Sequence, residues 1–589
     1  MKSPGISPLG ILSKSKLFLP FKKTIIILFL AEILSSAFYF TGPYLSKLFI
    51  DNSFLKKDLH SFIILTLISG CIFIFSMLLS AIANIIKNRQ GIKTKLALAD
   101  KFISKFYSLD LEFFQANSAG ENIYRLSDIE RIKAFVIERL PNFFANIFRF
   151  FMVMAIALMV NLRLTIILVL LSPLFLIQSL YLRKKLKPIY EEAWRLSAQL
   201  SKKVFEAFSR MLLIKALGLE GTMRRAYKRL LLKNIRLGLG AFKWSLVSSL
   251  SSSFLSKAVF AVLSFYGGWM IIKGRLSLGS YTAAMLYLTQ LGSLIKSLSS
   301  GFEFFLQDMI SVDRFFELVT KEPAIKDSMD AITINSLGSE IEFKAVSFVY
   351  QPGNPVLKNI CFKIPAQKWI AIVGPSGCGK TTLVSLILRL YDPWSGEIIL
   401  DNMNLRKISL KSLRERISIA TQEPFLFDLS FRENIAYGLS CIGFAEIEKA
   451  AEIAQLHDFV SQLPDGYDTL IGENACRLSQ GIKQRVALAR AIVRESDLLI
   501  LDEATSSIDS ATEEKIFSAL RQERQGKSTI VISHRLFSIK DADCIYYLRQ
   551  DGIVEQGAHK ELLAKSDSYC TFFQRQIEEA RVASVVIPG

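Results

Sequence analysis

A glycine-rich segment at residues 374–381 carries the residue types that bind nucleotide phosphates. It reads Gly-Pro-Ser-Gly-Cys-Gly-Lys-Thr, follows the apolar run Trp369–Val373 and opens the helical stretch Lys380–Leu390. Glycines at this spacing let backbone N–H groups approach phosphate oxygens, and a helix N-terminus adds a favourable field. We expect Lys380 to bridge the β- and γ-phosphates and Thr381 to ligate Mg²⁺. The predicted nucleotide contacts here are Gly374, Ser376, Gly377, Cys378, Gly379, Lys380, Thr381 and Thr382.

Two adjacent carboxylates, Asp502 and Glu503, follow the apolar strand Leu498–Leu501. Ligands of parallel sheets bind beyond the carboxyl ends of the strands, so this strand can bring Asp502 to the magnesium held at Thr381. Glu503 is then placed to act on the attacking water as general base. A solvated acidic pair at a strand end is the alternative, and the phosphate-binding segment upstream disfavours it. ATP and Mg²⁺ are the predicted cofactors.

The elements that hold these residues are short β-rich runs alternating with helical stretches. Trp369–Val373, Leu498–Leu501 and Thr529–Ser533 are continuous apolar strands, which are typical of a buried, largely parallel sheet. We therefore predict an α/β P-loop ATPase domain at residues 339–589, preceded by a polar linker at residues 318–338.

The first half of the chain has a different composition. The whole sequence is 51% hydrophobic and only 21% charged, and its mean hydropathy is +0.33. A bilayer-spanning helix needs about 20 apolar residues. Buried core helices of a soluble domain are the alternative, but those are shorter and have a polar face. We predict an all-α transmembrane domain at residues 1–317 with six spans, at about 24–45, 62–86, 143–160, 164–182, 246–272 and 279–298.

Charge gives the spans an orientation. Residues 1–338 hold 43 Lys and Arg against 21 Asp and Glu, an excess of +22, whereas residues 339–589 hold 29 against 32, an excess of −3. The basic residues concentrate in two long connections with helical periodicity, residues 87–142 and 183–245. By the positive-inside rule these connections are cytoplasmic helical extensions, and both termini are inside. Because the excess lies in the apolar half, nucleic acid is not a predicted partner.

The order of further motifs resembles the ATP-binding-cassette (ABC) transporters. The pattern consists of the phosphate-binding segment, Gln422, residues 477–485 (Arg-Leu-Ser-Gln-Gly-Ile-Lys-Gln-Arg), Asp502-Glu503, residues 507–509 (Ser-Ile-Asp) and residues 531–534 (Val-Ile-Ser-His). The six-span domain resembles that of bacterial half-exporters of the lipid and multidrug flippase type. Residues 111–114 and 214–220 are similar to the two cytoplasmic segments that touch the cassette in that family.

The resemblance implies roles for individual residues. Tyr350 would stack on adenine, Gln422 would sense magnesium and the attacking water, and His534 would hold the γ-phosphate. Ser479 and Gly481 would face the γ-phosphate bound by the opposite subunit, and Asp509 would contact the opposite cassette. Each has a structural alternative: a tyrosine on a surface strand, a solvated glutamine, a capping or core histidine, or a helix-capping aspartate.

The signature segment departs from the family pattern Leu-Ser-Gly-Gly-Gln. It reads Leu478-Ser479-Gln480-Gly481-Ile482, so Gln480 adds bulk where the family has glycine and Ile482 replaces a polar side chain. We expect this change to affect closure between subunits rather than ATP binding.

The function implied is that of an ATP-driven exporter or flippase for a hydrophobic or amphiphilic substrate, working in the inner membrane with its cassette in the cytoplasm. Two chains would sandwich two ATPs; a homodimer is preferred, and a heterodimer would explain the altered signature. The alternative is an ATP-gated channel or regulatory subunit that binds nucleotide without pumping. A soluble DNA-handling ATPase would need long coiled-coil heptads, which the sequence lacks.

Three basic residues inside the predicted spans are candidates for substrate contact: Arg149, Lys257 and Lys296. At about 1.5 Å per residue from the external ends, they lie roughly 18, 24 and 25–27 Å deep, toward the cytoplasmic leaflet. Intramembrane charges are costly and therefore point to function. We expect them to favour an anionic lipid or lipid-linked substrate; the alternative is that they snorkel to the interface.

Overall fold

The structure is a computed structural model of the chain. It describes residues 22–117, 119–338, 340–350, 353–439, 441–472, 478–533, 535–549, 552–565, 568–572 and 574. The chain divides into two compact units, Met1–Glu322 and Pro323–Gly589. The division falls within the segment predicted as a linker.

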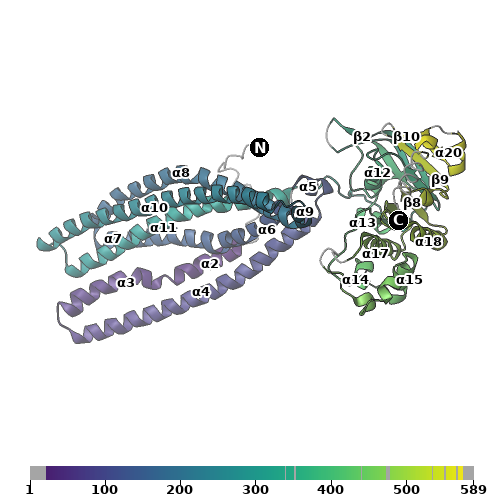
Figure 1. The fold of residues 1–589 in the computed structure, drawn as a ribbon. Coiled ribbons are helices and arrows are strands. Elements are labelled where there is room, and N and C mark those ends of the chain that lie inside the picture. Colours follow the sequence, from purple (N-terminus) through teal and green to yellow (C-terminus); the bar gives the residue numbers. More distant parts are fainter. Residues whose placement is uncertain are drawn as a thin grey trace. The chain divides into compact units, whose positions relative to one another are not determined.

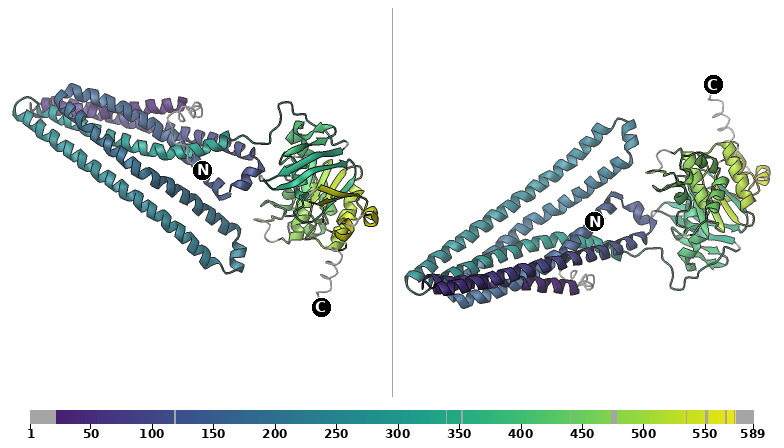
Figure 2. Two further views of the ribbon diagram at one scale, coloured as in Figure 1. Left: turned by 90° about the horizontal axis from the view of Figure 1, so that it is seen from above. Right: turned by 90° about the horizontal axis from the view of Figure 1, so that it is seen from below.

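The first unit is built of helices, most of them long (Figures 1 and 2). α8 and α10 pack along their length as a pair, and α11 packs on α3 and α7. The short helices α5 and α9 lie between long helices at one end of the unit. α5 contains the predicted contact segment 111–114, and the second segment, 214–220, runs from the end of α9 to the start of α10. The helices are α2 (Lys22–Leu34), α3 (Ala37–Leu48), α4 (Leu59–Tyr107), α5 (Leu111–Ala116), α6 (Ala119–Ala134), α7 (Leu140–Val160), α8 (Leu162–Ser209), α9 (Met211–Ala216), α10 (Glu220–Ile272) and α11 (Leu278–Thr320), with π-helical turns at Phe49–Phe54 and Phe135–Arg139.

Five helical stretches among the described residues are long and apolar enough to cross a membrane. Their outward side chains are apolar: Leu67, Phe73 and Met77 of α4 are more than half exposed, as expected of helices that face lipid. The five stretches are Lys22–Phe54, Leu59–Tyr107, Arg125–Val160, Leu162–Ser209 and Glu220–Ile272.

The sixth predicted span lies within α11, which is not one of these five stretches. The position of α11 explains why its sequence is more polar than those of the five stretches. Ala283, Tyr287 and Leu291 are fully buried among the other helices, so α11 is a central helix. Tyr287 and Gln290 use their polar groups to donate to the backbone of α3, at Phe40 O (2.7 Å) and Tyr39 O (3.0 Å). A helix buried in this way needs less apolar surface than one that faces lipid, so the sixth span stays a prediction.

The second unit contains two sheets (Figure 1). An antiparallel sheet has the order β2-β1-β4-β5, and a six-stranded sheet has the order β10-β9-β3-β8-β7-β6. All neighbours in the larger sheet are parallel except the edge strand β10. The strands are β1 (Glu340–Val349), β2 (Pro355–Pro365), β3 (Trp369–Val373), β4 (Ser395–Leu400), β5 (Met403–Asn404), β6 (Ile417–Ala420), β7 (Leu498–Asp502), β8 (Ser528–Ile532), β9 (Cys544–Arg549) and β10 (Gly552–Gly557).

Both faces of the parallel sheet are covered. In β3, Trp369, Ala371 and Val373 enter one apolar cluster, while Ile370 and Ile372 enter the other. This explains why the strand has no polar alternation, and it confirms the predicted α/β class. The helices of this unit are α12 (Lys380–Ile387), α13 (Leu410–Glu415), α14 (Phe431–Ile435), α15 (Phe444–Ile453), α16 (His457–Ser461), α17 (Gln480–Ile492), α18 (Ser510–Glu523), α19 (Leu536–Ile539) and α20 (His559–Lys565).

Candidate nucleotide-binding site

The phosphate-binding segment joins β3 to α12 in a conformation that requires glycine. Gly377 and Gly379 have φ angles of +80° and +103°, and a Cβ at Gly379 would lie 2.6 Å from Leu357 Cδ2. A Cβ at Gly374 would lie 2.2 Å from the carbonyl oxygen of Leu548. Lys380 is buried, and its Nζ donates to the carbonyl oxygens of Gly374 (2.9 Å) and Pro375 (3.0 Å). The Lys380 side chain therefore lies inside the phosphate-binding loop, where it can reach the phosphates that it is predicted to bridge. The glycine backbone and the lysine together are suited to a nucleotide phosphate.

The side chains of this segment separate into two groups. Ser376 and Thr381 are exposed, whereas Cys378 and Thr382 are buried. Burial raises the pKa of the Cys378 thiol, although the charge of Lys380 opposes that shift. The thiol is therefore turned away from solvent, and the backbone N–H of Cys378 donates to Pro375 O at 3.4 Å within the loop.

Tyr350 lies next to this segment. Its hydroxyl is 3.2 Å from Thr382 Oγ1, and its ring makes edge contacts with Phe348 and Tyr391, at centroid distances of 4.8 and 5.3 Å. The ring is held in place yet 43% exposed. This arrangement favours a platform for a base beside the phosphate cradle.

The acidic pair lies at the carboxyl end of β7. Asp502 is buried, and burial together with the charge of Glu503 raises its pKa, while hydrogen bonding to the Thr381 side chain opposes that rise. Thr381 and Asp502, two of the three predicted magnesium ligands, are therefore adjacent, and a bound cation would compensate the buried carboxylate. Glu503 has a φ of +49°, and its N–H donates to Ile532 O at 2.9 Å. Left-handed backbone at a glutamate costs about 1–3 kcal/mol and persists where the surroundings impose it.

Gln484 of α17, to which the sequence analysis gave no role, connects three predicted elements. Its side chain is 1% exposed, and its Nε2 donates to the carbonyl oxygen of Gln422 (3.1 Å) and to Ser506 Oγ (2.9 Å). Its Oε1 accepts from Ser507 N at 2.9 Å. It thus holds the segment of Gln422 and the segment before Asp509 against the signature helix. The sequence signal for it was its place within segment 477–485, two residues after the signature.

The signature residues begin α17. Ser479 caps the helix by accepting from Ile482 N at 3.3 Å, and a Cβ at Gly481 would approach Ser507 O to 3.0 Å. Gln480 is exposed, whereas Ile482 is buried in the core, so the isoleucine does not present its side chain at the surface. Of the two departures from the family pattern, only Gln480 changes the exposed face.

Asp509 caps α18 by accepting from Thr512 N at 2.9 Å, and this hydrogen bond is the main reason that its pKa is lowered. The side chain is exposed, so the capping role does not prevent a contact with another cassette. His534 lies outside the described residues.

The three basic candidates of the first unit differ from one another. Arg149 is paired: its guanidinium contacts Glu32 Oε2 (3.1 Å) and donates to Ser36 Oγ (2.7 Å) and Asn146 Oδ1 (3.0 Å). Lys257 and Lys296 are exposed. Glu32 is the acid that the sequence analysis overlooked, although it is a single carboxylate inside the first predicted span.

Comparisons with known proteins agree with this geometry. The family model described as "ABC transporter transmembrane region" matches residues 25–295, and "ABC transporter" matches residues 357–506. An ATP-dependent lipid A-core flippase of Syntrophus aciditrophicus (strain SB) is 32% identical over 564 residues, covering 95% of this chain and 92% of that protein. The chain belongs to the ABC transporter family. Its cassette therefore binds ATP, and its two-unit architecture is that of a half-transporter.

Two further relatives specify the class of ABC transporter. A fatty acid ABC transporter ATP-binding/permease protein of Mycobacterium bovis is 32% identical over 478 residues, 81% of this chain and 75% of that protein. The structure of a bacterial Atm1-family ABC exporter with ATP bound superposes with a TM-score of 0.86 at 26% identity, covering 94% of this chain and 98% of that one. The predicted ABC exporter fold and ATPase activity coupled to export across a membrane are confirmed. The half-transporter architecture implies a dimer.

Proposed function

We propose that this ABC exporter moves an amphiphile with an anionic head group from the cytoplasmic leaflet, using Mg²⁺ and ATP at two composite sites between paired cassettes. The observation that carries the ATPase part is the adjacency of a glycine cradle, Lys380, and the Thr381–Asp502 pair. When bound, Mg²⁺ would be held by Thr381, Gln422 and Asp502, and it would neutralise charge on the phosphates.

The remaining site residues are proposed to have the roles that the phosphate-binding motifs and the family resemblance imply. Glu503 accepts the proton of the attacking water, and His534 contacts the γ-phosphate. Tyr350 supports the adenine, and the phosphate segment from Gly374 to Thr382 holds the phosphates. Ser479, Gly481 and Asp509 act on the opposite chain, which we propose to be a second copy. Both termini and the cassettes lie in the cytoplasm of a cell whose inner membrane holds the helical unit.

The substrate proposal rests on the basic side chains of the helical unit and on the names of two relatives, a lipid A-core flippase and a fatty acid transporter. Lys257 and Lys296 are exposed on their helices, and Arg149 has a carboxylate partner. We propose that the two lysines contact the head group directly. Arg149 contacts it together with Glu32, whose charge reduces the attraction of the guanidinium for an anion.

The test is ATPase activity in liposomes with and without an anionic lipid. We expect stimulation by anionic lipid in the wild type and its loss when Arg149, Lys257 and Lys296 are all replaced by Gln, with basal turnover kept. A Lys257→Gln and Lys296→Gln double variant leaves the Arg149–Glu32 pair intact and separates its contribution. Lys449→Gln, which removes an exposed ion pair of the cassette, is the control. Unchanged stimulation in the triple variant would exclude these residues from the substrate site.

A further inference from the structure

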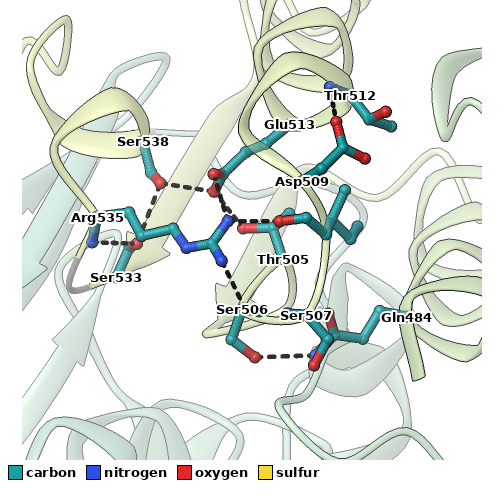
Figure 3. Close-up of polar contacts among 11 residues, drawn as sticks. Gln484, Thr505, Ser506, Ser507, Asp509, Thr512, Glu513, Ser533, Arg535 and Ser538 are labelled. Carbon is teal, nitrogen blue, oxygen red and sulfur yellow. Dashed lines mark hydrogen bonds and ion pairs between the residues drawn. The ribbon is translucent and has the colours of Figure 1, made fainter. Parts of the chain in front are cut away.

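A buried polar cluster joins three segments of the cassette: the loop that follows Glu503, the start of α18, and the residues around Arg535 and Ser538 (Figure 3). At its centre is Glu513, on the first turn of α18, whose side chain is 1% exposed. Glu513 Oε1 accepts from Thr505 Oγ1 (2.6 Å) and Ser538 Oγ (3.0 Å). Its Oε2 accepts from the Arg535 guanidinium at 2.9 Å. A buried carboxylate is tolerated only with partners of this kind, so the cluster has one well-satisfied arrangement.

Arg535 ties this carboxylate to the backbone of the loop that follows Glu503. Its guanidinium donates to the carbonyl oxygens of Ile508 (2.6 Å) and Ser506 (2.7 Å) while it pairs with Glu513. Three acceptors in different directions suit the planar fork of arginine, and the single ammonium of a lysine cannot span them.

The same loop is held from the other side by the signature helix. Gln484 accepts from Ser507 N and donates to Ser506 Oγ, as described above. Segment 506–508 is therefore held by hydrogen bonds from two sides, by Gln484 on one side and by Arg535, which pairs with Glu513, on the other (Figure 3). The segment begins three residues after Glu503 and ends one residue before Asp509.

We propose that Arg535 and Glu513 are positioning residues for ATP hydrolysis: they set the backbone of loop 503–509 so that Glu503 and Asp509 are correctly placed. This inference rests on the proposed roles of those two residues. Neither Arg535 nor Glu513 belongs to the nucleotide cradle, so the pair acts on the rate of the chemical step rather than on nucleotide affinity. A displacement of about 1 Å in a catalytic group costs roughly 10²-fold in rate.

The test compares Arg535→Lys and Glu513→Gln with the wild type, using the full chain in liposomes with MgATP. We expect kcat to fall roughly tenfold to a hundredfold with KM for ATP changed less than about threefold. Binding of trinitrophenyl-ATP should be unchanged, because Lys380 and Tyr350 are intact. The matched control is Glu523→Gln on the same helix, which removes only an exposed ion pair with Lys449 (2.7 Å) and should leave kcat unchanged.

A single replacement leaves one buried charge without its partner, and such variants can fail to fold. The double variant Glu513→Gln and Arg535→Gln removes both charges, and its folding is followed by its melting temperature. A folded double variant with a low kcat and a normal KM supports the proposal. Normal kcat in folded variants, or a raised KM alone, would overturn it. Unfolding of the neutral double variant would also overturn it, since the cluster would then be a folding element. Absence of MgATP turnover in the wild type would contradict the proposed function instead.

Discussion

The altered signature gives a prediction in which the two changed positions behave differently. Ile482 is 6% exposed and packs in the core, whereas Gln480 is an exposed residue at the start of α17. Restoring the family residue by Ile482→Gln removes a buried aliphatic side chain, worth about 1.5–3 kcal/mol, and buries an amide in its place. We expect a loss of about 2–4 kcal/mol in cassette stability and no gain in ATPase rate. Ile482→Val, a one-methylene change, should cost about 0.5–1.5 kcal/mol.

Gln480→Gly should have the opposite profile. Glycine at an exposed first helical position costs no more than about 1 kcal/mol, and it removes bulk from the face predicted to meet the opposite subunit. We expect kcat to rise while the melting temperature changes little, since 1 kcal/mol shifts a domain of this size by about 2–4 °C. The assays are thermal unfolding and ATPase rate of the purified chain. An Ile482→Gln variant with wild-type stability and raised kcat would refute the reasoning, because residue 482 would then face the nucleotide.

Three further predictions concern the nucleotide cradle. Tyr350→Ala should weaken ATP binding about 5- to 100-fold in calorimetry, because a base-stacking surface is lost. Tyr350→Phe loses only the contact with Thr382 and should change the ATP affinity less than threefold. Equal losses of affinity in both variants would show that the hydroxyl, rather than the ring, is what ATP binding depends on. Gly379→Ala should reduce ATP affinity more than Gly377→Ala. Both glycines have positive φ, but only a Cβ at Gly379 would approach other atoms, with Leu357 Cδ2 the nearest. Equal affinities of the two variants would show that the contact with Leu357 does not matter for ATP binding. Iodoacetamide should modify Cys378 more slowly than the exposed Cys361 and Cys441, because burial shields the Cys378 thiol and raises its pKa. The rate of Cys378 modification should increase as the pH rises toward that pKa. Equal labelling of the three cysteines in peptide mass spectrometry would show that the Cys378 thiol is open to solvent.

Much of the cassette could be predicted from local patterns. A continuous apolar run followed by glycines and a lysine indicated β3, its loop and α12, and the apolar run before Asp502 indicated β7. Because the strands are parallel, their carboxyl ends share one edge, so the adjacency of Thr381 and Asp502 followed from the fold class. Five of the long apolar helices were equally clear, because lipid-facing helices must be apolar over most of their surface.

The rest depended on contacts between distant segments. Nothing local to Arg149 shows that Glu32, 117 residues earlier, pairs with it. The burial of Ile482 is set by how α17 packs on the sheet, and the signature alone does not reveal it. Arg535 and Glu513 are 22 residues apart, and although each lies close to a motif, nothing in the sequence shows that their side chains pair beside loop 503–509. The polar sequence of α11 does not by itself show that Tyr287 and Gln290 donate to the backbone of α3, about 250 residues earlier in the chain.

The central claim is that ATP hydrolysis at Glu503 drives movement of an amphiphile across the membrane. The most direct test is translocation of a fluorescent anionic lipid in liposomes containing the full chain, measured with MgATP for the wild type and for Glu503→Gln. We predict ATP-dependent translocation by the wild type, and for Glu503→Gln we predict retained ATP binding without sustained translocation. Translocation by Glu503→Gln at the wild-type rate, or translocation by the wild type without ATP, would contradict the account.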